Sequence, residues 1–107
     1  MNVTTPLQAH PRKRFTVYEV PSDYMSPTMQ PGDLVEIDST VTRAHADGVY
    51  LVAFPAGMPA LRRIQALLGN NRVRVFCDQD PAAADECDSK DLRILGRATR
   101  AMNVRQL

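Results

Sequence analysis

The chain has 107 residues, the size of one ordinary domain, so we expect a single hydrophobic core and no second folded unit. Hydrophobic residues make up 44% and charged residues 23%, which is typical of a soluble globular protein and excludes a disordered chain. The formal net charge of +1 excludes an overall electrostatic attraction to nucleic acid or to an anionic membrane, so a DNA contact would need a local patch or a separate domain.

The first part of the chain predicts a short leader followed by a strand. Residues 1–13 have little hydrophobic periodicity and two prolines, which predicts a flexible leader ahead of one domain at residues 14–107. No signal-peptide core and no apolar run of bilayer length is present, so we expect a cytoplasmic location and no membrane contact. Residues 14–20 alternate between the two faces of a first strand.

The middle of the chain predicts a proline-rich turn and two strands. Three prolines in residues 21–33 exclude a regular helix there, although Pro27 suits the start of a single helical turn. A short apolar strand follows at 33–38. Residues 49–54 are almost continuously apolar after an Asp-Gly turn, and are the best candidate for a buried central strand.

The second half of the chain predicts further strands around one acidic loop. Residues 60–68 fit a helix or a strand, and the turns on both sides favour a strand in a hairpin with 72–78. Residues 78–91 hold six acids, one lysine and no apolar period, so we expect a solvated loop. Residues 92–104 predict one long or bent strand, with Gly96 at a bulge or a close backbone approach. The fold is therefore predicted to be mainly β.

Metal and cofactor sites are not predicted. Cys77 and Cys87 are spaced neither as metal ligands nor as a disulfide framework, and are expected to be free thiols in a reducing compartment. His10 and His45 stand in polar segments without Glu or Cys at ligand-like spacing. The sequence has no glycine-rich phosphate loop and no serine-hydrolase elbow.

Residues 22–33, SDYMSPTMQPGD, resemble the motif (G/S)-D-S-M-x-P-T-x-x-x-G-D of the Ser-Lys self-cleaving domains of LexA, UmuD and phage repressors, distant relatives of signal peptidase. LVEID, DGVYLVAF, LRRI and LRILGRATRAM resemble later segments of that family in the same order, so the resemblance covers about residues 14–105. It implies a LexA-like fold of several short, bent antiparallel strands with at most one or two short helical turns.

The departures from the family pattern imply a domain without peptidase activity. The position of the family's nucleophilic serine is Tyr24, and that of its basic lysine is Arg62, ahead of Arg63. A guanidinium stays protonated and cannot act as the base. Residues 1–23 also lack the Ala-Gly or Cys-Gly bond that self-cleaving members carry. We expect the Tyr24 ring to fill the former substrate cleft and its hydroxyl to bond Arg62.

Two catalytic alternatives remain. Ser26 could replace the lost nucleophile, but a two-residue step along an extended chain moves the hydroxyl by roughly 6 to 7 Å, beyond the reach of about 3 Å that proton transfer needs. Its position suits a cap on the turn at Pro27 and Thr28. A tyrosine nucleophile activated by Arg62 is the other alternative. The candidates for a cleft or a partner-binding site are Asp23, Tyr24, Met25, Ser26, Arg62 and Arg63.

The resemblance implies the C-terminal half of a phage or prophage repressor, which forms dimers or larger assemblies and supports cooperative DNA binding by a separate N-terminal helix-turn-helix. This chain shows no helix-turn-helix pattern, so it is either an excised domain or a stand-alone relative. A module that binds a peptide or an antirepressor in the degenerate cleft is the other hypothesis. Met and Arg are enriched at interfaces, and the last strand supplies the interface candidates, although an ordinary edge strand would explain them equally: Leu92, Ile94, Leu95, Arg97, Met102 and Val104.

Overall fold

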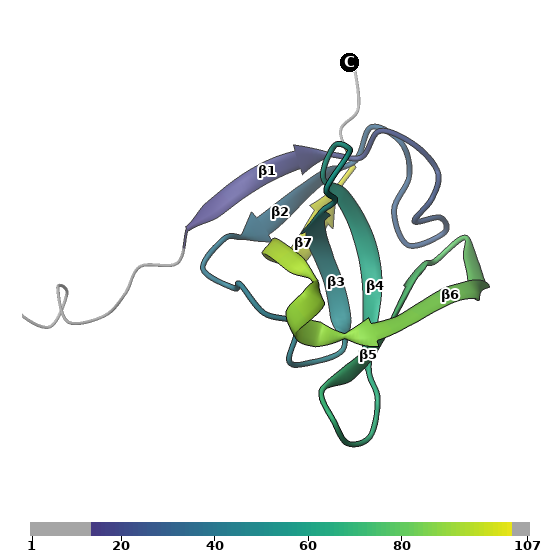
Figure 1. The fold of residues 1–107 in the computed structure, drawn as a ribbon. Helices are drawn as coiled ribbons and strands as arrows, with labels where there is room; N and C mark the ends of the chain where they lie inside the picture. The colour runs from purple at the N-terminus through teal and green to yellow at the C-terminus, as the bar shows by residue number, and fades with distance from the viewer. Residues whose placement is uncertain (1–13, 104–107) are drawn as a thin grey trace, which may run out of the picture.

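The computed structural model describes residues 14–103 and shows one seven-stranded antiparallel sheet with a single 3-10 turn over that range (Figure 1). The mainly β prediction is confirmed. The order of strands across the sheet is β1-β2-β7-β3-β4-β5-β6, so β1 and β6 form its two edges. The elements are β1 (Phe15–Glu19), β2 (Leu34–Asp38), β3 (Gly48–Ala53), β4 (Ala60–Ala66), β5 (Arg72–Cys77), β6 (Asp80–Asp88), the 3-10 turn η1 (Ser89–Asp91) and β7 (Arg93–Met102).

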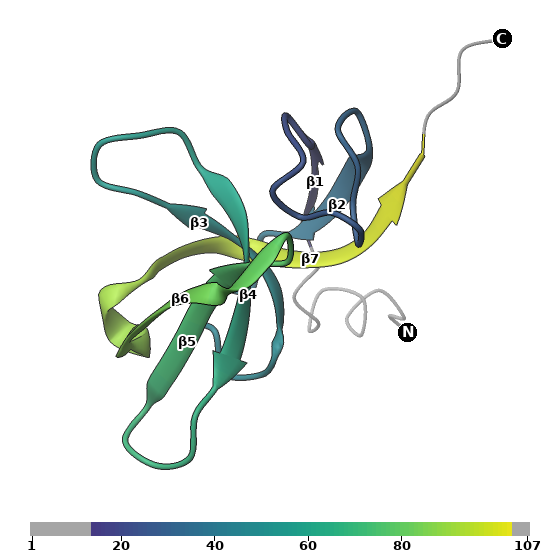
Figure 2. The same ribbon diagram turned by 90° about the vertical axis from the view of Figure 1, so that its right-hand side faces the viewer.

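The last strand, β7, lies in the middle of the sheet. Its first half, residues 93–97, pairs with β3 on one side, and its second half, residues 97–102, pairs with β2 on the other, and Figure 2 shows it running across the molecule between them. Gly96 makes this crossing possible, because a Cβ there would lie 2.4 Å from the Ile37 Cγ2 and 2.8 Å from the Asp38 carbonyl oxygen. The ladder with β3 also shifts register beside Gly96, between Leu51 and Val52. The expected bulge and the close backbone approach are both present.

The core is divided between the two faces of β3. Val49 and Leu51 belong to one buried cluster, and Tyr50 and Val52 belong to a second. Burial on both faces explains why this strand reads as a continuous apolar run, and the prediction of a buried central strand is confirmed. The ambiguous segment at 60–68 is also a strand, β4, which pairs with both β3 and β5.

The prediction of a solvated loop at residues 78–91 is wrong. This segment forms the edge strand β6 and then η1. Most of its side chains are exposed, so the strand needs no apolar alternation. Two of its acids are in register with cations of the neighbouring strand, Asp88 opposite Arg72 and Glu86 opposite Arg74. Opposite charges at such positions favour strand pairing without contributing to a hydrophobic core.

Both cysteines are free thiols, in agreement with the sequence. Within residues 14–103, no helix has the length and apolar character needed to cross a membrane.

Candidate functional site

The candidate site is built around the loop at residues 20–33, between β1 and β2, which we call the motif loop. Backbone hydrogen bonds close its base, because Val20 N–H donates to the Asp33 carbonyl at 2.9 Å and Gly32 N–H to the Val20 carbonyl at 2.8 Å. Gly32 has a φ of +90°, a conformation that favours glycine. No helix forms after Pro27, and one turn is closed instead by the Met29 N–H and the Met25 carbonyl, 2.9 Å apart.

Two methionines anchor the motif loop to the core. Met25 and Met29 are only 2% and 5% exposed, and both pack in the cluster that contains Val49 and Leu51. Met25 was a candidate for the cleft or a partner-binding site. Its side chain packs in the core, and this packing accounts for a methionine at that position of the motif. Flexible thioether side chains suit this purpose because they fill irregular gaps.

Tyr24 and Arg62, which the sequence resemblance aligns with a nucleophile and a base, lie against each other. The Arg62 Cζ is 5.7 Å from the centre of the Tyr24 ring and 5.4 Å from that of Phe54, at the end of β3. Arg62 Nη1 also donates to the Leu61 carbonyl at 2.7 Å. The guanidinium therefore contacts the faces of two rings, as cation-π pairs do. The expected bond from the Tyr24 hydroxyl to Arg62 is not present among residues 14–103.

A small cavity and a larger groove adjoin this pair. The cavity has a volume of about 30 Å³, which is enough for a water molecule, and it lies between Tyr24, Arg62 and the start of the motif loop. Tyr24 lines the cavity and is 55% exposed, so it is not buried inside it. The groove, of about 620 Å³, runs along mainly apolar side chains that include Tyr18, Leu51, Met58 and Pro59.

Tyr18 connects β1 to this groove. Its hydroxyl donates to the Pro59 carbonyl at 3.2 Å, across the groove from β1. Burial raises the pKa of the Tyr18 phenol, and the nearby positive charge of Arg62 opposes this only in part. The phenol therefore remains a neutral hydrogen-bond donor at neutral pH.

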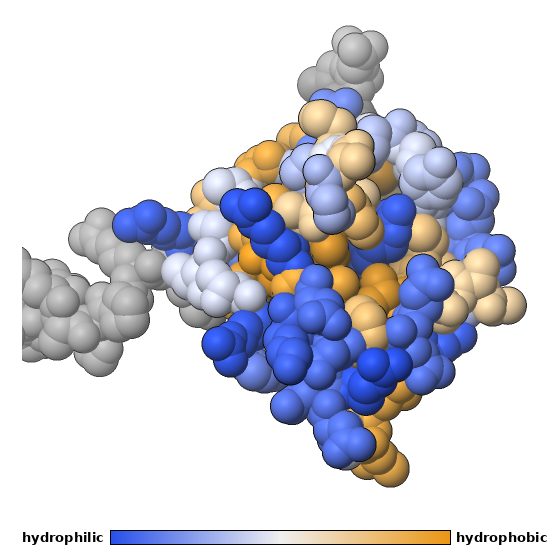
Figure 3. All heavy atoms as spheres, in the orientation of Figure 1, coloured by the Kyte–Doolittle hydropathy of each residue, from blue (hydrophilic) through white to orange (hydrophobic). Residues whose placement is uncertain are grey.

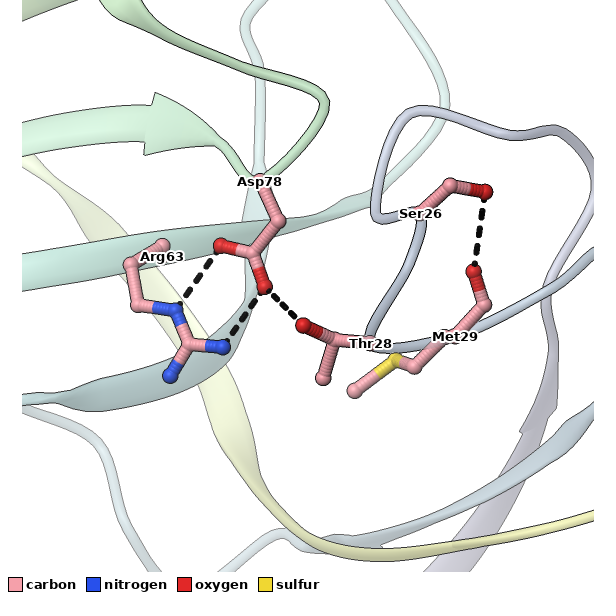
Figure 4. Close-up of polar contacts among 5 residues, drawn as sticks. All are labelled: Ser26, Thr28, Met29, Arg63 and Asp78. Carbon is pink, nitrogen blue, oxygen red and sulfur yellow. Dashed lines mark hydrogen bonds and ion pairs between the residues drawn. The ribbon is translucent and has the colours of Figure 1, made fainter.

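The Ser26 hydroxyl makes only local bonds. Its single hydrogen is shared between the Met29 carbonyl, 3.3 Å from Ser26 Oγ (Figure 4), and Gln30 Oε1, 3.2 Å away. Neither a carbonyl nor an amide oxygen can accept the proton of a nucleophilic serine under ordinary conditions. The side chain thus stabilises the turn that follows it, which is the function that its place in the motif suggests.

The strongest polar contact of the site joins Arg63, Asp78 and Thr28, a trio that we call the clasp. Arg63 binds Asp78 through two parallel bonds, Nε to Oδ1 at 2.9 Å and Nη2 to Oδ2 at 2.6 Å (Figure 4). The Thr28 hydroxyl donates to the same Oδ2 at 2.6 Å. The hydrogen bond from Arg63 is the largest cause of a lowered pKa of Asp78, opposed by burial and assisted by Thr28.

A second contact holds the motif loop from the same side. Gln79 N–H donates to the Tyr24 carbonyl at 3.0 Å, and its side-chain amide donates to Asp23 Oδ2 at 3.1 Å. Figure 1 shows the motif loop descending beside the turn between β5 and β6, where Asp78 and Gln79 lie. The backbone of Tyr24 is therefore positioned by a hairpin far away in the sequence.

The sequence did not reveal Asp78 or Gln79 as members of this site. Both stood in the acidic segment that we interpreted as a loop, and their partners Thr28 and Asp23 are 50 and 56 residues away. The one local signal is that Asp78 directly follows the alternating run of β5. A carboxylate at the end of a strand is too common to predict such a bond.

The predicted interface residues on β7 have different environments. Ile94 is 5% exposed and lies in the core, and Leu92 and Leu95 pack against the two buried clusters. The Arg97 guanidinium lies 5.7 Å from the centre of the Tyr50 ring. Met102 is 44% exposed, and Val104 lies outside the described residues. In the strand order β7 is not at an edge, but each of its halves has a strand on one side only, β3 beside residues 93–97 and β2 beside residues 97–102.

Within residues 14–103, no three His, Cys, Asp or Glu side chains gather as a possible metal site, and His10 lies outside that range. No protein-family model matches the chain, and no curated protein matches it.

Proposed function

We propose that this chain is a LexA-like C-terminal domain of a phage-type or prophage-type transcriptional repressor, catalytically inactive and acting in the cytoplasm. Its role is self-association, as a dimer or larger, which supports DNA binding by a separate N-terminal helix-turn-helix. One observation carries the proposal: positions 24 and 62, which the resemblance makes nucleophile and base, lie against each other although they come from distant segments. A motif that matched the sequence by chance would give no reason for this contact.

The side chains at these two positions support the absence of catalysis. Arg62 is a permanent cation that offers donors only, so it cannot take a proton from a hydroxyl. Its guanidinium is engaged by the rings of Tyr24 and Phe54. Ser26, the nearest alternative nucleophile in the motif, donates to a carbonyl and an amide oxygen.

Self-association would contribute to repression through effective concentration. Linking two DNA-binding units makes the second contact with a palindromic operator intramolecular, and this can raise the overall affinity by orders of magnitude without any new base contact. The nearly neutral net charge of this chain fits a domain that does not itself hold DNA.

Two measurements test the proposal. Sedimentation at micromolar concentrations is expected to show a dimer or a larger species, and a strictly monomeric chain would contradict the association. Prolonged incubation at alkaline pH, followed by mass spectrometry, is expected to leave the chain intact. Specific scission that disappears in Ser26→Ala would instead identify a self-cleaving peptidase that uses Ser26.

The apolar groove beside Tyr18 favours a second candidate function, the binding of an antirepressor or another extended peptide. Met58, on the wall of this groove, is 84% exposed. Under this hypothesis Met58→Asp weakens binding of the partner, whereas Leu68→Asp, at an exposed position outside the groove, does not. Equal binding by both variants would eliminate the groove as the binding surface.

A further inference from the structure

The outer edge of β1 carries backbone groups that β2 does not use. Ser39 N–H donates to the Arg14 carbonyl at 2.7 Å, and Val20 N–H to the Asp33 carbonyl at 2.9 Å. Backbone bonding alternates along an antiparallel strand, so the even-numbered residues from 14 to 20 bond to β2. The N–H and C=O groups of Phe15, Val17 and Glu19 therefore point to the other side, where residues 14–103 provide no neighbouring strand.

Two apolar side chains of β1 are also exposed beside this free edge. Phe15 is 49% exposed and Val17 is 61% exposed, whereas Tyr18 packs against the core. In the view of Figure 3, hydrophobic residues reach the surface at the upper left, over β1, whereas the lower half of the molecule is largely hydrophilic. Exposed backbone and exposed apolar side chains thus coincide on one strand.

The two edges of the sheet differ in how they are protected from other chains. Edge strands usually avoid association by means of prolines, charges or bulges. β6 has all three, namely Pro81, several acids and a register shift against β5. β1, FTVYE, has no proline and a single charged residue, Glu19, and it pairs with β2 without a register shift. The β1 edge is therefore less protected against strand addition than the β6 edge.

We propose that β1 is the surface on which two copies of this chain associate, pairing antiparallel with Val17 at the twofold axis. This inference rests on the proposed self-association and names its surface. In this register Val17 faces Val17 of the second copy and Phe15 faces Glu19. In each of these pairs, the two facing residues then donate an N–H to each other's C=O group.

Self-complementarity is the reason to choose a second copy as the occupant. A twofold interface uses the same surface twice, so a strand must present donors and acceptors that match their own rotated image. The odd positions 15, 17 and 19 do so about Val17. The pairing also brings the exposed Phe15 diagonally beside Val17 of the other copy, within contact distance for an aromatic side chain.

Two substitutions at Val17 test the pairing. Val17→Pro removes only an N–H that points away from β2, so the β1–β2 ladder keeps its bonds while strand addition is blocked. Val17→Lys places two like charges opposite each other at the axis. Leu68→Lys is the matched control, because it makes a similar change at a fully exposed loop position.

Sedimentation equilibrium, with thermal melts to confirm folding, measures the effect. We expect both Val17 variants to raise the dimer dissociation constant at least about tenfold, which corresponds to about 1.4 kcal/mol, and Leu68→Lys to leave it unchanged. Self-association that persists in both Val17 variants would overturn the β1 interface and leave the proposed function standing. A wild-type chain that stays monomeric would overturn the proposed association itself.

Amide hydrogen exchange provides an independent readout of the same pairing. The amides of Phe15, Val17 and Glu19 are expected to gain protection as the protein concentration rises, because only dimerisation gives them partners. Those of Thr16 and Tyr18 are bonded to β2 at every concentration and should change little. Gains in protection that fall elsewhere in a dimer, with the odd amides of β1 unchanged, would refute the register.

Discussion

Replacing Asp78 by Asn tests whether the clasp holds the motif loop. The substitution keeps the shape of the side chain but removes its charge and replaces one acceptor oxygen with an NH2 group. This group would face the donors of Arg63 or Thr28, which now converge on the carboxylate at distances of 2.6 to 2.9 Å. At least one donor therefore loses its acceptor.

The structure sets the size of the expected effect. The Asp78 side chain is 10% exposed and that of Arg63 is 30% exposed, so the pair is largely but not fully removed from water. Breaking a buried ion pair costs about 3 to 5 kcal/mol, and we reduce this because water can still reach Arg63. We expect a loss of about 2 to 3 kcal/mol in the free energy of unfolding, and a fall of roughly 8 to 20 °C in Tm.

Denaturant and thermal unfolding of matched variants provide the assay. Thr28→Val, which removes one donor of the clasp, is expected to cost about 1 kcal/mol, and much less when Asp78 is already Asn. Arg100→Ala is the control, because its ion pair with Glu36 spans 3.4 Å and the Arg100 side chain is 71% exposed. Exposed pairs of this kind contribute under about 1 kcal/mol.

The pH dependence of this effect has a definite sign. The clasp lowers the pKa of Asp78 in the folded protein below its usual value. The stabilisation is therefore complete above the unfolded pKa of about 3.9 and is lost as the pH falls through the folded value. The difference between wild type and Asp78→Asn should be constant near neutral pH and shrink in acid. A loss below about 0.5 kcal/mol at pH 7 would refute the structural role of the clasp.

Three further outcomes are expected. Gly96→Ala should lower the free energy of unfolding by about 2 kcal/mol or more, because its Cβ would collide with β2, whereas Gly57→Ala, in open space, should be neutral in the same denaturant titration. Tyr24→Phe should leave Tm unchanged because the ring keeps its contact with Arg62, and Tyr24→Ala should cost about 0.5 to 1 kcal/mol; a large loss in Tyr24→Phe would point to a hydroxyl bond. Burial raises the pKa of the Cys87 thiol, so its alkylation near pH 8 should be slower in the folded than in the unfolded chain, and equal rates would contradict this burial.

The site could be predicted from the sequence only in part. The motif at residues 22–33 singled out Tyr24, and the LRRI segment singled out Arg62, and these two side chains do meet. The type of contact was not predictable, because an arginine can meet a tyrosine through the hydroxyl or through the ring face, and backbone placement decides between them. Asp78 was missed because its bonds to Arg63 and Thr28 depend on where the β5–β6 hairpin is placed relative to the motif loop.

The strands themselves follow from the sequence wherever burial imposes a pattern. β3 is buried on both faces and reads as continuously apolar. β5 reads as alternating, although Phe76 is buried beside the register shift between Val75 and Cys77 and breaks the alternation of burial. Gly96 marked the close approach of two backbones because no other residue fits there. β6 was not predicted, because an exposed edge strand buries too little of its surface to require a hydrophobic pattern in its sequence.

The order of the strands was decided by the tertiary structure alone. Local alternation identifies a strand but not its neighbours, since neighbours are chosen by pairing between segments far apart in the chain. The last strand, β7, inserts between β2 and β3, so the edge of the sheet is formed by the first strand and not by the last. For this reason the sequence directed attention to β7 as the interface, whereas the structure pairs β7 with inner strands and leaves one side of β1 unpaired along its whole length.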